Sequence, residues 1–179
     1  ETPTVGALRR RLTRDGAEPL AVAFHAQIRR HLGKVTVLRA LADGVAAGAH
    51  LGGGNLGGLL GLGGAAVPDR LAAGSVALAV KSDQLSAGQL LLAEAVRSAP
   101  GWVPGPAPMM ARLLSPANER DETRLSSALA RMVDVDPYLR VEQDAASGHS
   151  VLRVQGPMHL RRVLEHLEWN LSGQGKSAV

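Results

Sequence analysis

Cysteine is absent from this chain of 179 residues, and aromatic side chains are scarce. Without cysteine there can be no disulfide scaffold, no thiolate-ligated zinc or iron–sulfur centre and no thiol nucleophile. The only aromatic residues are Phe24, Trp102, Tyr138 and Trp169. A base-stacking platform for single-stranded RNA needs several exposed rings close together, so their scarcity argues against one.

Long hydrophobic runs are also lacking. No apolar stretch reaches the roughly 18 residues that a transmembrane helix needs, and no signal peptide is visible, so we expect a soluble cytoplasmic protein without a membrane partner. Apolar residues still make up 45% of the chain, enough for a core built from Ala, Val and Leu. The chain begins with Glu1 rather than Met, and we therefore expect it to be a piece of a longer protein.

The net charge of +4 is distributed unevenly. Residues 1–40 carry eight Lys/Arg and three Asp/Glu, whereas residues 41–100 carry three and four, and residues 101–179 carry nine of each. The whole positive excess therefore lies near the N-terminus. A local basic patch of this kind can bind nucleic acid or an acidic partner, and a solvated arginine face is the alternative interpretation.

The first half of the chain has the pattern of a β domain preceded by a linker. We predict that residues 1–18 are a linker with one short basic helical stretch, in which Val5, Leu8 and Leu12 share a face. Residues 19–99 show short runs in which apolar residues alternate with small ones, bounded by glycine turns. Short strands with turns at this spacing predict a small antiparallel β-barrel.

A glycine-dense stretch interrupts the β pattern between residues 51 and 64. No Lys-Ser/Thr pair follows it and no strand–helix–strand unit surrounds it, so it matches neither a phosphate-binding nor a dinucleotide-binding loop. We interpret its glycines as the positions of tight turns, bulges or close packing of the barrel.

The second half of the chain predicts an α+β domain. Prolines and glycines at residues 100–106 indicate a hinge between two domains. In residues 107–179 the pattern gives a strand at 109–114, a helix from Ser115 or Asn118 to Asp136, strands at 139–143 and 151–155 around a turn, and a helix from Gly156. This β-α-β-β-α order predicts a ferredoxin-like split βαβ domain whose last strand is missing or incomplete. We therefore expect truncation at the C-terminus as well.

Two sets of apolar residues mark the buried faces of the predicted helices. The first set is spaced i, i+3, i+4, i+7 and consists of Leu125, Ala128, Leu129 and Met132. The second set, on the later helix, consists of Leu160, Val163, Leu164 and Leu167.

The residues predict no catalytic, cofactor-binding or metal site. The segment 173–177 ends in Gly-Lys-Ser but follows a helix and lacks the first glycine of a phosphate loop. His159 and His166 are seven residues apart, whereas zinc-binding helices usually place ligands four apart, so we interpret them as surface or cap histidines. Asp134 and Asp136 could form an acid pair, but an Asp-Pro turn is the commoner role.

Three motifs of the second half resemble the elongation factor G family of translational GTPases. Residues 121–132 (DETRLSSALARM) look like the "LSxALxRL" helix of that family. Residues 136–142 (DPYLRVE) are similar to its "DPxxRV" strand start, and residues 156–160 (GPMHL) to its "GELHL" motif. Order and spacing agree over about residues 106–168.

The first half resembles the same family more loosely. Residues 19–24 look like the opening strand of its second domain, residues 33–40 like its "GRLTxxRV" strand and residues 71–90 like its "LxAGDxxAVxGL…TGDTL" segment. The resemblance thus implies a translation-factor β-barrel followed by a ferredoxin-like domain, as the second and third domains of a diverged elongation-factor-G-like protein.

The resemblance also implies partners and a cofactor outside this chain. In the family a GTPase domain precedes these two domains, and two further domains follow. GTP and magnesium would then belong to the absent GTPase domain, with no cofactor in this chain. The implied partners are the ribosome, through its rRNA and a small-subunit protein, and the absent domains of the same chain. The implied activity is coupling of GTP hydrolysis to movement on the ribosome during elongation.

Seven residues are our candidates for contacts with the ribosome, its RNA or neighbouring domains. They are Arg29, Arg30, Lys34 and Arg39 on the barrel, and Arg124, Arg131 and His159 in the third domain.

Two departures from the family pattern leave the function open. Pro157 and Arg161 stand where the family has acidic residues. A non-catalytic ribosome-associated binding protein and a relative of ribosomal-protection or release factors are therefore alternatives to a translocase. A phosphate-binding loop upstream of this chain would support the GTPase.

Overall fold

The computed structural model describes residues 3–29, 31–67, 69–100, 105–116 and 119–171. The chain divides into two compact units, unit 1 (Glu1–Trp102) and unit 2 (Val103–Val179). Residues 101–104 of the predicted hinge lie outside the described residues, so the hinge and the predicted domain limits stay predictions.

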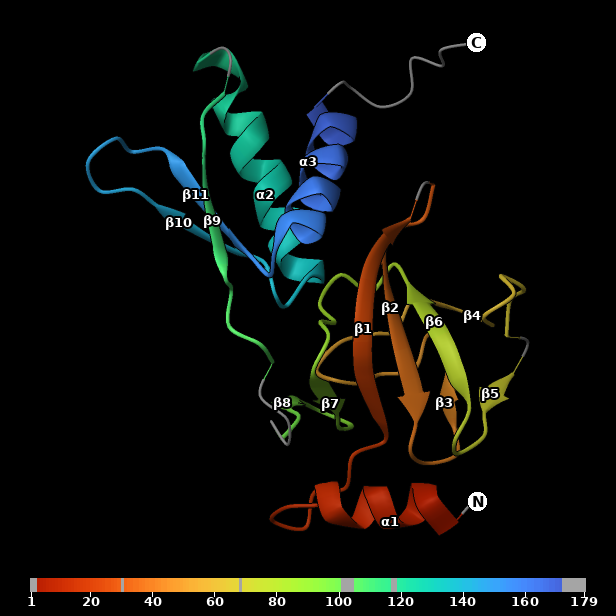
Figure 1. Ribbon diagram of the computed structural model, residues 1–179. Coiled ribbons are helices and arrows are strands. Elements are labelled where there is room, and N and C mark those ends of the chain that lie inside the picture. Colours follow the sequence, from red (N-terminus) through yellow and green to blue (C-terminus); the bar gives the residue numbers. More distant parts are fainter. Residues whose placement is uncertain (1–2, 30, 68, 101–104, 117–118, 172–179) are drawn as a thin grey trace. The chain divides into compact units, whose positions relative to one another are not determined.

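Unit 1 contains one helix and eight short strands in its described part (Figure 1). Their bounds are α1 (Pro3–Leu12), β1 (Ala21–Arg29), β2 (Gly33–Ala40), β3 (Val45–Ala46), β4 (Gly58–Leu60), β5 (Arg70–Leu71), β6 (Val76–Val80), β7 (Gln89–Leu91) and β8 (Val96–Ser98). Six strands form an antiparallel sheet in the order β4-β6-β2-β1-β7-β8, and β3 pairs with β5. The predicted antiparallel strands are confirmed, but among the described residues the order ends at β4 and β8, and no ladder closes it into a barrel.

Small side chains on the strands and leucines from the loops build the core of unit 1. Ala21 of β1, Ala77 and Ala79 of β6 are almost inaccessible to solvent and share one cluster with Leu56 and Leu85, which lie between strands. Alanine on the strands leaves space for these longer side chains. A dense core can therefore form without aromatic residues.

Gly57 shows why the stretch between residues 51 and 64 is rich in glycine. A Cβ atom at this position would collide with the backbone oxygens of Val80 and Lys81 at the end of β6. The amide nitrogen of Gly57 donates a hydrogen bond to Ser82 Oγ at 2.9 Å, which holds the two segments together. The interpretation of close packing is confirmed at this glycine.

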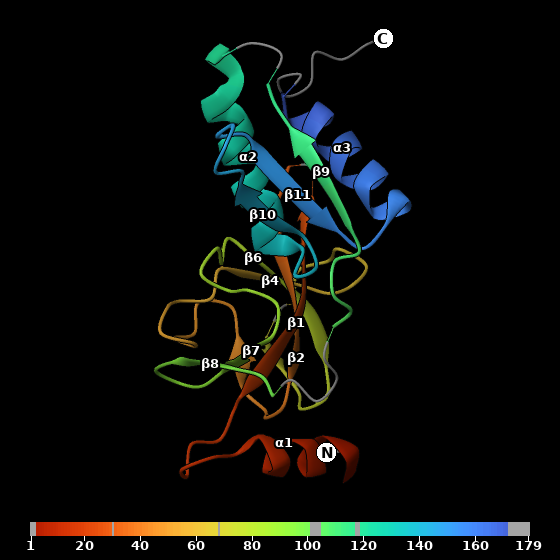
Figure 2. The same cartoon turned by 60° about the vertical axis from the view of Figure 1, so that its left-hand side comes forward.

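Helix α1 packs against the rest of unit 1 through the apolar face that the sequence predicted. Val5 and Leu12 are buried in a cluster with Leu41 and Leu90. The Arg97 guanidinium donates to the Leu12 carbonyl oxygen at 2.6 Å and so satisfies an acceptor at the end of the helix. Figures 1 and 2 show α1 lying across the end of the strands at which β1 begins.

Unit 2 has the predicted β-α-β-β-α order. Its elements are β9 (Met110–Leu114), a 3₁₀ turn (Glu119–Asp121), α2 (Glu122–Val135), β10 (Arg140–Gln143), β11 (Ser150–Val154) and α3 (Pro157–Leu171). The three strands form an antiparallel sheet in the order β10-β11-β9. Both helices lie on the same face of this sheet (Figures 1 and 2).

The helices of unit 2 bury the faces that their periodicity predicted. Leu125, Ala128, Leu129 and Met132 of α2 are buried. On α3, Val163 and Leu167 are buried and Leu160 and Leu164 pack against the same cluster, which Leu152 and Val154 of β11 complete. Helix α2 begins at Glu122, later than Ser115 or Asn118, because the 3₁₀ turn precedes it; Asn118 itself lies outside the described residues. Its end before Asp136-Pro137 is confirmed.

The turn between β10 and β11 is held by a carboxylate. Asp144 Oδ2 accepts hydrogen bonds from the backbone nitrogen and the hydroxyl of Ser147, at 2.9 and 2.7 Å. These bonds favour the charged carboxylate and lower the pKa of Asp144 below its usual value. Gly148, with a φ of 71°, completes the turn in a conformation that other residues rarely adopt.

Candidate functional site

The predicted basic residues of unit 1 lie at two different ends of the β1–β2 pair. Arg29 pairs with Gly33 next to the turn, and its side chain is exposed. Lys34 is one residue further along and donates from Nζ to the Asp83 carbonyl oxygen at 3.0 Å. Arg30 lies outside the described residues. Arg29 and Lys34 are thus neighbours at the turn of this hairpin.

Arg39 lies near the other end of the hairpin, where it pairs with Val22 of β1 and Val76 of β6. Its side chain is half-buried, and Nε is buried with no hydrogen-bond partner among the described atoms. The structure therefore separates Arg39 from Arg29 by nearly the full length of the strands.

In unit 2, Arg124 connects the two helices. Its Nη2 donates to the carbonyl oxygen of Leu171 at the end of α3, at 2.7 Å, and its Nη1 donates to Asp121 Oδ1 at 3.3 Å. The cation thus satisfies a carbonyl at the C-terminal end of a helix, where a positive charge is favourable. Arg131 follows two turns later on α2 and is exposed.

His159 connects the opposite ends of the same two helices. Its Nδ1 accepts the backbone N–H of Gln155 at 3.2 Å, and its Nε2 lies 2.8 Å from Asp136 Oδ2. Because Nδ1 accepts, the neutral ring carries its proton on Nε2 and donates it to Asp136. The other oxygen of Asp136 accepts the backbone N–H of Tyr138 at 3.0 Å.

Two of the predicted contact residues therefore hold unit 2 together. Arg124 joins the start of α2 to the end of α3, and His159 joins the start of α3 to the residue after α2. The helices are antiparallel, and each end of the pair has one polar connection. Among the predicted residues that the structure describes, Arg29, Arg124 and Arg131 have exposed side chains, and of the two on α2 Arg124 is the one engaged with Asp121 and the Leu171 carbonyl oxygen.

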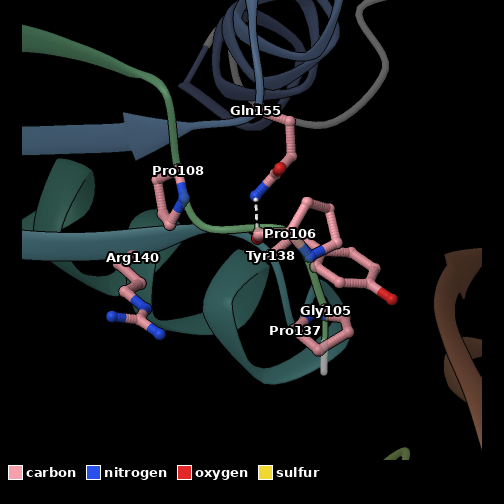
Figure 3. Close-up of a pocket in the computed structure, with 7 residues that line it drawn as sticks. All are labelled: Gly105, Pro106, Pro108, Pro137, Tyr138, Arg140 and Gln155. Carbon is pink, nitrogen blue, oxygen red and sulfur yellow. Dashed lines mark hydrogen bonds between the residues drawn. The ribbon is translucent and has the colours of Figure 1, made fainter. Parts of the chain in front are cut away.

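A cavity of about 300 Å³ lies within unit 2, beside the connection between His159 and Asp136. Its walls are Gly105, Pro106, Pro108, Pro137, Tyr138, Arg140 and Gln155. Gln155 Nε2 donates to the Pro106 carbonyl oxygen at 3.1 Å, the bond drawn in Figure 3. The Tyr138 ring lies beside Pro106 and approaches Gly105 so closely that a Cβ at Gly105 would stand 2.6 Å from it. The cavity combines prolines and one aromatic ring with one guanidinium.

Arg140 also belongs to the face of the sheet that the helices leave uncovered. It stands directly opposite Arg153, and two like charges in such a pair repel each other. Arg153 Nε donates to Glu142 Oε2 at 2.7 Å, which offsets part of that repulsion. Both arginines are exposed, so this face presents cations suited to bind anions.

Sequence reasoning did not identify the cavity. Its walls come from the segment 105–108, from residues 137–140 and from the end of β11, and only the fold brings them together. Prolines on two of these segments were the available signal. In the described ranges, no group of three or more His, Cys, Asp or Glu side chains is placed to hold a metal ion. No helix in this part of the chain is long and apolar enough to span a membrane.

Comparison with known proteins identifies the class of protein. Residues 105–172 match the family described as Elongation Factor G, domain III. An elongation factor G-like protein of Synechocystis sp. is 30% identical over 168 residues, which are 93% of this chain and 25% of that protein. The elongation factor G of Fervidobacterium nodosum is 35% identical over 63 residues, 35% of this chain and 9% of that protein.

A solved structure agrees with these relatives. A crystal structure of a Thermus thermophilus protein matches with a TM-score of 0.70 and 25% identity, covering 91% of this chain and 26% of that one. The chain thus spans about a quarter of the length of its Synechocystis relative and of this structure.

These matches relate the chain to translation elongation factors. Residues 105–172 match the domain III of elongation factor G, and most of the chain is similar to an elongation factor G-like protein. The resemblance that the sequence motifs carry is confirmed.

Proposed function

We propose that the chain supplies the second and third domains of an elongation-factor-G-like protein that acts on the ribosome in the cytoplasm. The observation that carries the proposal is the β-α-β-β-α unit at the position of the domain III match, preceded by an antiparallel β unit. Similarity to the Synechocystis protein over 93% of the chain supports the same order of domains. Coupling of GTP hydrolysis to movement would depend on a GTPase domain, which would hold GTP and magnesium.

Unit 1 would act as the translation-factor β-barrel of this protein. Its six-stranded antiparallel sheet and its alanine- and leucine-filled core support this assignment. Such a core makes unit 1 a rigid body. The predicted hinge at residues 100–106 would then allow unit 2 to pivot as a second rigid body.

The ribosome contacts would come from cations that the structure leaves exposed. Arg29 on unit 1 and Arg131 on unit 2 fit this role best, because both side chains are exposed, whereas the exposed Arg124 already contacts Asp121 and the Leu171 carbonyl oxygen. Arg30, Lys34 and Arg39 remain proposed contacts on the same hairpin. Arg124 and His159 would act indirectly, by holding α2, which carries Arg131, against α3.

Equilibrium binding of the full-length protein to ribosomes and to GTP tests the proposal. We expect both to bind, and we expect Arg131→Gln to weaken ribosome binding severalfold because a phosphate contact is lost. Arg162→Gln, an exposed arginine on α3, is the matched control and should bind like the wild type. A full-length protein that binds neither ribosomes nor GTP would refute the proposal.

Pro157 and Arg161 favour a second candidate, a ribosome-associated binding protein that does not turn over GTP. Both residues are accommodated by the fold: Pro157 is the first residue of α3, where proline is favourable, and Arg161 Nε donates to Glu165 Oε1 at 2.9 Å. They change the surface of domain III and keep its helix. GTP hydrolysis measured with and without ribosomes separates the candidates, since only the GTPase shows ribosome-stimulated turnover.

A further inference from the structure

Four arginines lie in one short stretch at the start of unit 1, and the structure divides them into two groups. Arg9 is turned toward Glu18, with Nη2 2.6 Å from the carboxylate oxygen Oε2. Arg10, Arg11 and Arg14 are exposed. One arginine therefore neutralises the nearby acid, and three remain at the surface.

The geometry of α1 directs two of these arginines away from the core. A helix turns by about 100° per residue, so Val5 and Leu12, seven residues apart, point in nearly the same direction. Both are buried. By the same rotation Arg10 and Arg11 lie about 150° and 110° from that buried direction. Arg14 follows in the turn after the helix, with Asp15 as the only acidic neighbour between residues 3 and 17.

The helix that carries these cations is well fixed. Val5 and Leu12 are 1% and 3% exposed, and the Arg97 guanidinium holds the carbonyl of Leu12. Arg10 and Arg11 lie in the last turn, where the negative end of the helix dipole favours positive charge. Because the helix is already ordered, ligand binding carries no entropic cost of ordering its backbone.

The exposed side chains on α1 indicate which kind of partner this surface fits. Besides the arginines, the exposed residues among the described side chains of α1 are Thr4 and Ala7, and no large apolar side chain lies among these. Protein interfaces depend on buried aromatic or aliphatic anchors at their centre. Contacts made by charge alone, with guanidinium groups that match phosphate oxygens in pairs, are typical of nucleic-acid backbones.

We propose that Arg10 and Arg14, with Arg11 beside them, form an arginine face that binds the phosphate backbone of RNA. Among the candidates from the sequence, none lies on α1, so this surface adds to the proposed ribosome contacts. The inference rests on the proposed function in one respect: that the natural RNA ligand is ribosomal RNA. The phosphate contact itself is argued from the exposure of Arg10, Arg11 and Arg14.

The test is equilibrium binding of the 179-residue chain to an RNA duplex of about 20 base pairs, at salt concentrations from about 50 to 200 mM. For Arg10→Gln/Arg14→Gln we expect binding weakened about tenfold or more at the lowest salt. The slope of log affinity against log salt should fall by about 2, since two phosphate contacts are lost. Arg10→Lys/Arg14→Lys should keep most of the slope because it keeps the charge.

The matched control is Arg120→Gln/Arg162→Gln, which removes two exposed positive charges from unit 2. We expect it to keep the wild-type slope, and all variants to keep the wild-type thermal unfolding. An unchanged slope in the Arg10/Arg14 variant, or an equal loss in the control, would overturn the proposal. Polyglutamate that displaces the RNA at equal charge concentration would assign the face to an acidic protein instead. Ribosome binding of the full-length protein is a separate readout, so its failure would refute the proposed function and leave this slope test intact.

Discussion

At the scale of single residues, two side chains that the sequence suggested as surface contacts stabilise the fold of unit 2. Arg124 and His159 each satisfy a partner on the other helix of unit 2. A histidine and an arginine near helix ends could equally face solvent, and the sequence holds no signal that separates the two roles. Only the packing of α2 against α3 shows which carbonyl and which carboxylate they reach.

His159→Ala is expected to destabilise unit 2. It leaves Asp136 Oδ2 and the Gln155 N–H without their partner, and the loss of hydrogen bonds at a largely buried ring should lower the free energy of unfolding by about 1–2 kcal/mol. Urea unfolding at neutral pH measures this change. His149→Ala, at an exposed position in the β10–β11 turn, should change it by less than about 0.5 kcal/mol. Equal effects of the two variants would contradict the role of His159.

Ser147→Ala is expected to raise the pKa of Asp144 toward its usual value. The hydroxyl of Ser147 is the largest cause of the lowered pKa, and the variant removes it while keeping the backbone donor. Because the folded-state pKa lies below the unfolded one, the stabilisation is present above a pH of about 3.9 and is lost as the pH falls through the folded-state pKa. An NMR titration of the Asp144 carboxyl carbon checks this, with Ser127→Ala as the control. An identical pKa in Ser147→Ala and wild type would refute it.

At the scale of elements, unit 2 could be predicted and unit 1 only in outline. The helices of unit 2 carry their apolar residues at i, i+3, i+4 and i+7. This local pattern predicts both the helix and its buried face. In unit 1, β3 and β5 have two residues each, too few for an alternation to be recognised. Their pairing depends on contacts between residues far apart in sequence, which no local pattern reports.

The candidate site could likewise be predicted from the sequence only in part. The exposed cations on α1 and α2 could be predicted, because helical spacing tells which side faces solvent. The cavity could not, since Tyr138, Pro106 and Gln155 come from three segments that meet only in the folded unit. The tautomer of the His159 ring likewise depends on its hydrogen bonds with Gln155 and Asp136, which lie on either side of the histidine in space.

Gly57→Ala tests the close approach of two segments in unit 1. The added methyl group would collide with the backbone oxygens of Val80 and Lys81, so we expect a loss of about 1–3 kcal/mol in the free energy of unfolding. Chemical denaturation measures it. Gly63→Ala is the matched control, because a Cβ there meets no atom within 4 Å. If both variants unfold at the same denaturant concentration, the close approach is not needed for stability.

At the scale of the whole molecule, each unit has a core of its own. The cluster that fills unit 2 draws its members from residues 110–171, and the clusters of unit 1 draw theirs from residues 5–99. Leu129, 2% exposed, belongs only to the cluster of unit 2. A substitution can therefore disrupt the core of one unit and leave the core of the other unit unchanged.

Leu129→Ala is expected to destabilise unit 2 by about 2–5 kcal/mol, through lost burial and the cavity that remains. Amide hydrogen exchange should accelerate across α2, α3 and β11, while the amides of β1 and β2 keep their protection. Leu113→Ala, at a position 53% exposed on β9, is the control and should leave exchange nearly unchanged. Accelerated exchange in β1 and β2 would show that the cores do not unfold separately.

The two polar connections of the α2–α3 pair have a mechanical consequence. Arg124 and His159 hold opposite ends of the pair, so α2 cannot slide along α3 by a helical turn of about 5.4 Å without breaking both. A force that pulls α2 along α3 would therefore act on both polar connections together. Removal of one connection would leave a single polar contact to resist this sliding.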